Sequence, residues 1–360
     1  MADRSSGERI VPVYPGRSWE TALASEVSMD GDRLRSIAFG QAGCIIRYGY
    51  MVHAWGDLTD RSAGGSDIKP VFSHFLLKAV EEGLVPNIDA KVVDFEPRLG
   101  SLNADLGHKD RDITWAHMAN QVACYGTQER PGTAFDYNDF NMALFGDTVF
   151  FKIYGATSWD DANEKVVVPK LTGPIQCEDR PAGFDHHGRL PFSVRDHCRF
   201  GLLYLRKGRW GDQQLISPEH ADMAVNSNLP GWFSRSKGVR SEVIPNQRTM
   251  GDFGGGINQT AHCGSYSFAW WTNGTNRDGV RRMPDAPPNL YGCEGGSWTH
   301  FSGMYVVPSS ELIVCWHSAP RTDTPIDPSL SYEELSHMVA DYTAQTLNHF
   351  LAGVVATIKE

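Results

Sequence analysis

Two β-hairpin patterns, one near each end of the chain, constrain the fold more than any other feature of the sequence. Over residues 43–56, two apolar runs flank a turn at Tyr48-Gly49-Tyr50. Near the other end, residues 304–307 and 312–316 flank a turn that contains Pro308. Hairpins join antiparallel strands, so these patterns predict an antiparallel sheet that is assembled from both ends of the chain.

Helical patterns fill the middle of the chain and close it. After Ser66, apolar residues recur at helical spacing as far as Gly83, a residue that suits a helix end. Further helices are expected over residues 112–123, 137–155, 193–206 and 332–358. A loop-rich stretch over 208–264 and a strand over 267–271 are expected between the last two of these helices.

This order of elements predicts an α+β fold. We expect an antiparallel sheet flanked by N- and C-terminal helices, with an inserted, mostly helical subdomain. The predicted organisation is a single domain over residues 1–360. Within it, residues 20–65 and 250–360 would form an α/β subdomain and residues 66–249 a helical subdomain.

The balance of charges excludes several classes of partner. The chain has 33 basic and 43 acidic residues, a formal net charge of −10, which argues against nucleic acid and anionic membranes. It has no apolar run long enough to span a membrane. Residues 1–9 are polar, so no signal peptide is visible and a cytoplasmic location is favoured; a periplasmic or secreted location applies if a leader has been removed. The oligomeric state cannot be read from the sequence.

The cysteines show no pattern of a disulfide framework or a zinc knuckle. They are widely spaced and odd in number, and no Cys-x-x-Cys occurs, so we expect reduced, buried side chains. They are Cys44, Cys124, Cys177, Cys198, Cys263, Cys293 and Cys315.

Ser-x-x-Lys is the motif through which this chain could perform nucleophilic chemistry. Gly-x-Ser-x-Gly, the common phosphate-binding loops and His-Glu-x-x-His are all absent. On a helix, residues three apart share a face, so the lysine amine can take the proton of the serine hydroxyl. The pattern occurs twice, as Ser66-Asp67-Ile68-Lys69 and as Ser234-Arg235-Ser236-Lys237.

The surroundings of the two copies separate them. Ser66 follows a Gly-Gly pair and opens the predicted helix, where free N–H groups favour developing negative charge, and Pro70 suits a first helical turn. Ser234 has no apolar helix on either side, which indicates a solvated loop. The alternative is that Ser66 is only a helix cap and Lys69 a surface charge.

From Ser66 onward the sequence resembles the serine β-lactamase and penicillin-binding-protein superfamily, closest to its esterase-like and class C-like members. The resemblance rests on Ser66-x-x-Lys69 and on Tyr137-Asn138-Asp139, which stands where the family usually has Tyr-x-Asn. A third element, usually Lys-Thr-Gly, His-x-Gly or Trp-x-Gly, should precede the C-terminal hairpin, where residues 295–300 stand. The three elements occur in the family's order over residues 20–355.

The chain departs from the family at two of these elements. Asp139 replaces the usual asparagine, and a carboxylate accepts hydrogen bonds but cannot donate them. The third element has no glycine in the expected frame: Trp298-Thr299-His300 fits by spacing, while a shift of two residues gives His300-Phe301-Ser302. Trp298 and His300 therefore both remain candidates for the functional side chain.

The resemblance implies acyl transfer on a small ester or amide. Ser66 would be the nucleophile, Lys69 and Tyr137 would move protons, and N–H groups of Ser66 and of the strand near Phe301 or Ser302 would hold the oxyanion. Asp139, Trp298, His300 and Ser302 are expected to bind substrate, and no metal or organic cofactor is implied.

The choice of substrate follows from what the third element lacks. No lysine stands there to bind a carboxylate, which favours a carboxylesterase whose substrate has none; Trp270, Trp271, Tyr291 and Trp298 are expected to line the cleft. The alternatives are a D-amino acid amidase or peptidase, a β-lactamase, and a non-catalytic binding or scaffold protein.

Overall fold

The computed structural model describes residues 10–61, 65–180, 182–251, 264–323, 326–327 and 329–359. Cys263, Gly64 and the polar start of the chain therefore lie outside the described residues. Within those residues, no helix combines the length and the apolar character needed to cross a membrane. The other six cysteines are buried and have free thiols, as expected.

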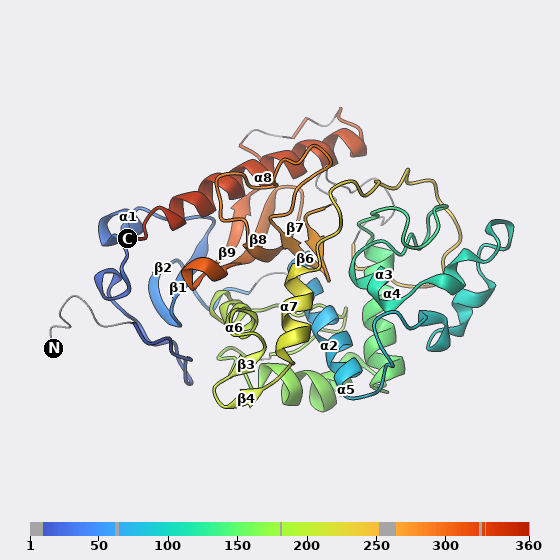
Figure 1. Ribbon diagram of the computed structural model, residues 1–360, viewed down its shortest axis with the longest axis horizontal. Helices are drawn as coiled ribbons and strands as arrows, with labels where there is room; N and C mark the ends of the chain where they lie inside the picture. The colour runs from blue at the N-terminus through green and yellow to red at the C-terminus, as the bar shows by residue number, and fades with distance from the viewer. Residues whose placement is uncertain are drawn as a thin grey trace.

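Both ends of the chain contribute strands to one antiparallel sheet, as the hairpin patterns predict. In the described part of the chain its order is β2-β1-β9-β8-β7-β6-β5, so the N-terminal hairpin joins the last strand through β1 (Figure 1). The strands are β1 (Ala42–Arg47), β2 (Tyr50–Trp55), β5 (Tyr266–Ser267), β6 (Trp270–Thr272), β7 (Tyr291–Gly296), β8 (His300–Val307) and β9 (Leu312–Pro320).

The turn between β1 and β2 shows why its residues suit a tight hairpin. Tyr48 and Gly49 both adopt left-handed backbone angles, with φ of 52° and 85°. Two consecutive residues of this kind match the right-handed twist of the flanking strands. A Cβ on Gly49 would also lie 1.9 Å from the carbonyl oxygen of Val13, so only glycine fits there.

Two helices cover the two faces of the sheet. Helix α8 (Tyr332–Val355) lies along one face, where Phe350 stacks on Phe39 with ring centroids 4.3 Å apart (Figure 1). Helix α6 (Val194–Leu205) packs against β1, β8 and β9 on the other face. Its approach is close, since a Cβ on Gly201 would lie 2.6 Å from the sulfur of Met304. The main core therefore lies on both sides of the sheet.

The remaining helices are α1 (Gly31–Arg35), α2 (Lys69–Glu81), α3 (Trp115–Ala119), α4 (Asp139–Asp147), α5 (Trp159–Ala162) and α7 (Pro218–Asn226). Of these, α1 lies beside the C-terminal end of α8, and the others lie on the α6 side of the sheet (Figure 1). Irregular turns include η2 (Ser66–Ile68), which runs into α2, and the π-helical η7 (Thr148–Ile153) and η8 (Asn163–Thr172). A separate small hairpin joins β3 (Arg209–Trp210) and β4 (Gln213–Gln214).

Three local predictions were wrong. The helix expected over 112–123 ends at Ala119, because Gln121 turns left-handed with a φ of 57°. The strand expected over 267–271 is instead the tight hairpin β5–β6, in which Phe268 and Ala269 have positive φ. Helix α7 lies inside the stretch expected to be loops; it starts with Ser217 as its cap and a proline in its first turn.

Candidate active site

Ser66 lies where a short 3₁₀ turn passes directly into helix α2. Pro70 stands in the first turn of that helix, where its missing N–H costs nothing. The three-residue spacing brings Lys69 back onto Ser66, and the lysine Nζ donates a hydrogen bond to the serine Oγ over 2.5 Å. The helix pattern of the sequence therefore correctly predicted the side-by-side placement of the two groups.

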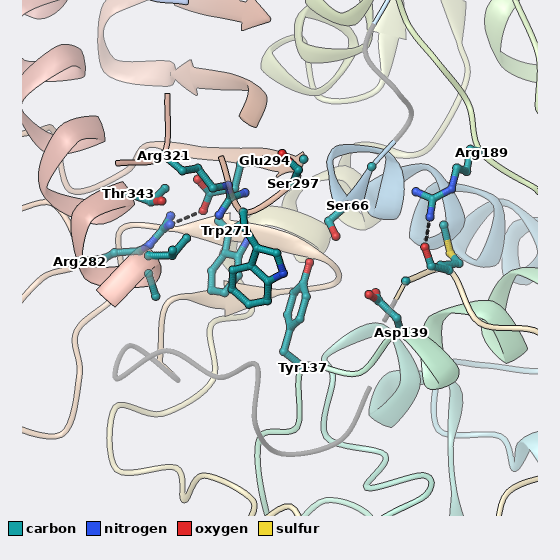
Figure 2. Close-up of a pocket in the computed structure, with 17 residues that line it drawn as sticks. Ser66, Tyr137, Asp139, Arg189, Trp271, Arg282, Glu294, Ser297, Arg321 and Thr343 are labelled. Carbon is teal, nitrogen blue, oxygen red and sulfur yellow. Dashed lines mark hydrogen bonds and ion pairs between the residues drawn. The ribbon is translucent and has the colours of Figure 1, made fainter. Parts of the chain in front are cut away.

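Tyr137 completes a chain of three polar groups. Lys69 Nζ lies 3.1 Å from the Tyr137 hydroxyl and 4.7 Å from the centre of its ring. The ring is held on its other side by Trp271, which stacks on it at 5.6 Å and 18°. In Figure 2 the hydroxyl groups of Ser66 and Tyr137 point towards one another across the cavity.

Asp139 forms an ion pair with the lysine of this group. Its Oδ1 lies 2.8 Å from Lys69 Nζ, and the side chains of the two residues are 14% and 2% exposed. The alternative role of helix cap belongs to the preceding residue, because the Asn138 side chain accepts hydrogen bonds from the N–H groups of Phe140 and Asn141. Asp139 is thus free of capping and faces the lysine.

The electrostatics of the site keep Tyr137 in its phenol form. Burial raises the pKa of Tyr137 well above its usual value, and the negative charge of Asp139 raises this pKa further. A hydrogen bond with Ser66 opposes both effects. At neutral pH the tyrosine is therefore a proton donor before it can act as a base.

The strand beside Ser66 is β7, and this corrects the predicted third element. A Cβ on Gly295 would lie 2.3 Å from the backbone nitrogen of Ser66, and a Cβ on Gly65 would lie 2.9 Å from that of Gly296. Only glycines permit such an approach of two backbones. The segment that borders the serine is therefore Glu294-Gly295-Gly296. Its two glycines precede Trp298-Thr299-His300, the tripeptide expected at this place.

Of the three residues expected at the third element, one lines the cavity and two do not. Trp298 lines the cavity from the turn after β7. His300 is exposed, and the Ser302 hydroxyl accepts a hydrogen bond from the N–H of Ser318; neither residue lines the cavity. Both were expected to bind substrate, but they lie on β8, which is one strand further from the serine than β7.

Sequence reasoning also misjudged the aromatic lining. Trp271 lines the cavity together with Trp298. Trp270 is fully buried and packs against Phe200 of α6, and Tyr291 is buried against Trp270, so neither reaches the cavity. Neighbouring residues of a strand point to opposite faces, which separates Trp270 from Trp271.

Charged side chains that no sequence pattern connects lie on two sides of the cavity that Ser66 borders (Figure 2). Arg282 forms an ion pair with Glu294, donates to the Tyr305 hydroxyl over 2.6 Å and lies 4.7 Å from the Trp271 ring centre. Arg321 lies over the Phe301 ring, and its buried Nε has no hydrogen-bond partner among the described residues.

The cavity these residues enclose is small. It has a volume of about 320 Å³, and Arg189 closes the side opposite Arg282 and Arg321 (Figure 2). The Arg189 guanidinium donates to the backbone oxygen of Met250. A serine hydroxyl, a phenol and several arginines thus border one space, with Lys69 in contact with the first two, an arrangement in which a small carbonyl compound can bind and transfer its acyl group to the serine.

Comparisons with known proteins find the same fold at low identity. No protein-family model matches the sequence, and no curated protein matches it. A β-lactamase from Mycobacterium bovis is 15% identical, with a TM-score of 0.53 over 89% of this chain and 98% of its own. EstCE1, a hydrolase with promiscuous acyltransferase activity, is 12% identical, with a TM-score of 0.52 over 87% of this chain and 98% of its own.

A third solved structure extends the likeness to penicillin-binding proteins. The octameric penicillin-binding protein homologue from Pyrococcus abyssi is 15% identical, with a TM-score of 0.50 over 84% of this chain and 72% of its own. These structures confirm the predicted α+β fold class. At such identities the likeness is one of fold.

Proposed function

We propose that this chain, which has the fold of the serine β-lactamase and penicillin-binding-protein superfamily, is a serine hydrolase that cleaves a small ester or amide. The observation that carries the proposal is the connected set of Ser66, Lys69 and Tyr137, joined over 2.5 and 3.1 Å at the edge of the cavity. A serine hydroxyl is a weak nucleophile unless a neighbouring group takes its proton, and Lys69 is in place to do so.

The reaction follows from these contacts. Lys69 can accept a proton only as the neutral amine, so it first passes one of its own protons to the paired Asp139 carboxylate. Ser66 Oγ then attacks the substrate carbonyl and its proton passes to Lys69. Tyr137 gives its phenolic proton to the leaving group as the carbon–heteroatom bond breaks, and Lys69 reprotonates it. Water then attacks the Ser66 ester, the same groups move its proton in the reverse direction, and the acid product leaves.

Backbone N–H groups are the natural donors to the oxyanion in this mechanism. Those of Ser66, at the start of the helical run, and of β7 near Gly296 lie on the two backbones that approach most closely. This proposal replaces the donors expected near Phe301 and Ser302.

The arginines favour a substrate with an anionic group. The missing lysine of the third element suggested a substrate without a carboxylate, but Arg321 supplies a cation from the segment after β9. Glu294 is ion-paired with Arg282 and its charge also acts on Arg321, so two guanidinium groups share one carboxylate and one positive charge is left over. Arg321 Nε has no hydrogen-bond partner among the described residues. We therefore propose that a carboxylate or similar anion on the substrate binds at Arg321, beside the carbonyl that Ser66 attacks.

Intact-mass spectrometry with acylating compounds tests the reaction. A panel of a fluorophosphonate, p-nitrophenyl esters, anilides and β-lactams should give at least one stoichiometric adduct on the wild-type chain. Ser66→Ala should give none, and Ser234→Ala should behave as wild type. A wild-type chain that forms no adduct with any of them would instead be a binding member of the fold, the main rival.

A pair of esters tests the substrate class separately. Mono-p-nitrophenyl glutarate and p-nitrophenyl valerate have chains of the same length with and without a terminal carboxylate. We expect the glutarate to have a kcat/KM about tenfold to a hundredfold higher, as a charged hydrogen bond provides. Arg321→Met should remove this preference while the rate on the valerate stays similar. If wild type and Arg321→Met prefer the glutarate to the same extent, Arg321 does not bind the anion of the substrate.

A further inference from the structure

A second group of reactive side chains lies in the core between the sheet and helix α6, away from the cavity. Cys315 and His317 stand two residues apart on β9 and so share a face of the sheet. His197 faces them from α6. All three side chains are at most 1% exposed.

The potential ligand atoms of these three residues converge. One ring nitrogen of His197, one of His317 and the Sγ of Cys315 all lie within 4.8 Å of one another. A fourth group adjoins them: Cys293 Sγ on β7 is 3.2 Å from His197 Nε2. Ligands of a tetrahedral zinc ion with ordinary Zn–S and Zn–N bonds are about 3.5 Å apart, so small side-chain movements would suffice for His197, Cys315 and His317. Cys293 Sγ is not among the atoms that lie within 4.8 Å of one another, so it is a neighbour of the group and not a member.

The imidazoles have nitrogen atoms that the protein leaves unsatisfied. Neither His197 Nδ1 nor His317 Nε2 has a hydrogen-bond partner within the described residues. A buried polar atom without a partner costs about 1–3 kcal/mol, so such atoms call for an explanation. The other nitrogen of His317 faces the half-exposed carboxylate of Asp60 at 3.5 Å, the kind of group that orients a metal-bound histidine.

We propose that His197, Cys315 and His317 form a buried zinc site that fixes α6 to strand β9. Imidazole and thiolate are the ligands that zinc prefers in structural sites. The Cys315 thiolate and the carboxylate of Asp60, which lies beside His317, would offset the two positive charges of the ion. Loading releases the thiol proton of Cys315 to solvent, and the partly exposed Asp60 marks the side from which the ion would enter.

Metal analysis of the purified full-length chain tests the proposal without reference to activity. Protein from zinc-supplemented cultures, dialysed against buffer without metal, should retain about one zinc per chain. Protein from cobalt-supplemented cultures should show the near-ultraviolet absorption of a thiolate-to-cobalt bond. A zinc content below about a tenth per chain with no such absorption would overturn the proposal, whatever the variants do.

Two variants and a control locate the ion. Cys315→Ala and His317→Ala should lose the bound zinc and the cobalt absorption, whereas Cys177→Ala should keep both, because Cys177 is an equally buried thiol outside the cluster. Retention of both signals in Cys315→Ala and His317→Ala would place any metal elsewhere and overturn the site. If these variants fail to fold, His197→Gln serves in their place.

Discussion

The two Ser-x-x-Lys segments of this chain share a sequence pattern but differ in backbone conformation and in burial. Ser66 and Lys69 lie on one turn of helical backbone, and the lysine is buried and in contact with its serine. The second copy lies alongside Phe135 as a single β-bridge, with Ser234 and Lys237 both exposed. Side chains three apart on an extended chain point to opposite sides, so the same four letters cannot form the same site.

The second copy contributes backbone hydrogen bonds to a neighbouring segment. Phe135 N–H donates to the Ser234 carbonyl oxygen over 2.7 Å, and the N–H of Ser236 donates to that of Phe135 over 2.9 Å. This bridge supports the segment that leads to Tyr137. The comparison teaches that a short motif is informative only with its backbone conformation and its burial.

The largest contrast should appear on removing the two serines. Ser66→Ala should reduce kcat/KM for the best p-nitrophenyl ester by several powers of ten, on the order of 10⁴ or more, because the nucleophile is lost. Ser234→Ala should leave kcat/KM within about twofold of wild type. Similar losses of kcat/KM in the two variants, in proteins with equal melting temperatures, would show that the two copies do not differ in function.

The two lysines should differ nearly as much. Lys69→Met should reduce kcat/KM by about 10²–10⁴ and should also lower the melting temperature, because it leaves the Asp139 carboxylate without its partner. Lys237→Met should change neither quantity, since that side chain is exposed. The double variant Lys69→Met/Asp139→Asn should recover stability but not rate. Recovery of the rate would show that Lys69 acts only by neutralising Asp139.

Tyr137 extends the comparison, because among the described residues the first copy contacts a tyrosine hydroxyl and the second does not. Tyr137→Phe keeps the ring on Trp271 and should lower kcat about 10²-fold or more, since proton transfer to the leaving group is lost. Tyr154→Phe removes a hydroxyl that donates to the Phe75 carbonyl oxygen and should cost only about 1 kcal/mol of stability. A leaving group of low pKa should need less help from Tyr137, so an effect that is equal for all leaving groups would argue against proton donation.

The smallest effect concerns acid stability near the first copy. His74 lies on the same helix as Lys69, and burial lowers its pKa to about 3. The unfolded chain therefore binds a proton below about pH 6.5 that the folded chain does not, and the free energy of unfolding falls as pH falls. At pH 5 the loss from this group is about 2 kcal/mol.

Denaturant unfolding at pH 6.5 and pH 5 measures this loss. His74→Gln should show a difference between the two pH values that is smaller by about 1.6 kcal/mol than that of wild type, because about 0.4 kcal/mol of the loss is already present at pH 6.5. Amide hydrogen exchange in residues 234–237 should not respond, because the second copy has no buried histidine. An unchanged pH dependence in His74→Gln would show that His74 is protonated in the folded chain.

The outline of the fold and the first half of the site could be predicted because both rest on local patterns. Alternation and turn residues identified the outer hairpins, and helical spacing after Ser66 placed Lys69 beside it. The Phe268-Ala269 turn and the short helix α3 could not be predicted in this way. Both depend on a distant contact, the hydrogen bond from the Phe268 N–H to Asn120 that follows α3.

By itself, therefore, the sequence determined the antiparallel hairpins, the helix that carries Ser66 and Lys69, and the separation of the two Ser-x-x-Lys copies. Only the tertiary structure decided that β7 borders the serine, and that Arg282, Glu294 and Arg321 meet in one cavity. The physical reason is that local backbone preferences act within a few residues, whereas strand order and register follow from packing across the whole chain. Gly295 illustrates the difference, because its lack of a side chain has meaning only once the backbone of Ser66 lies against it.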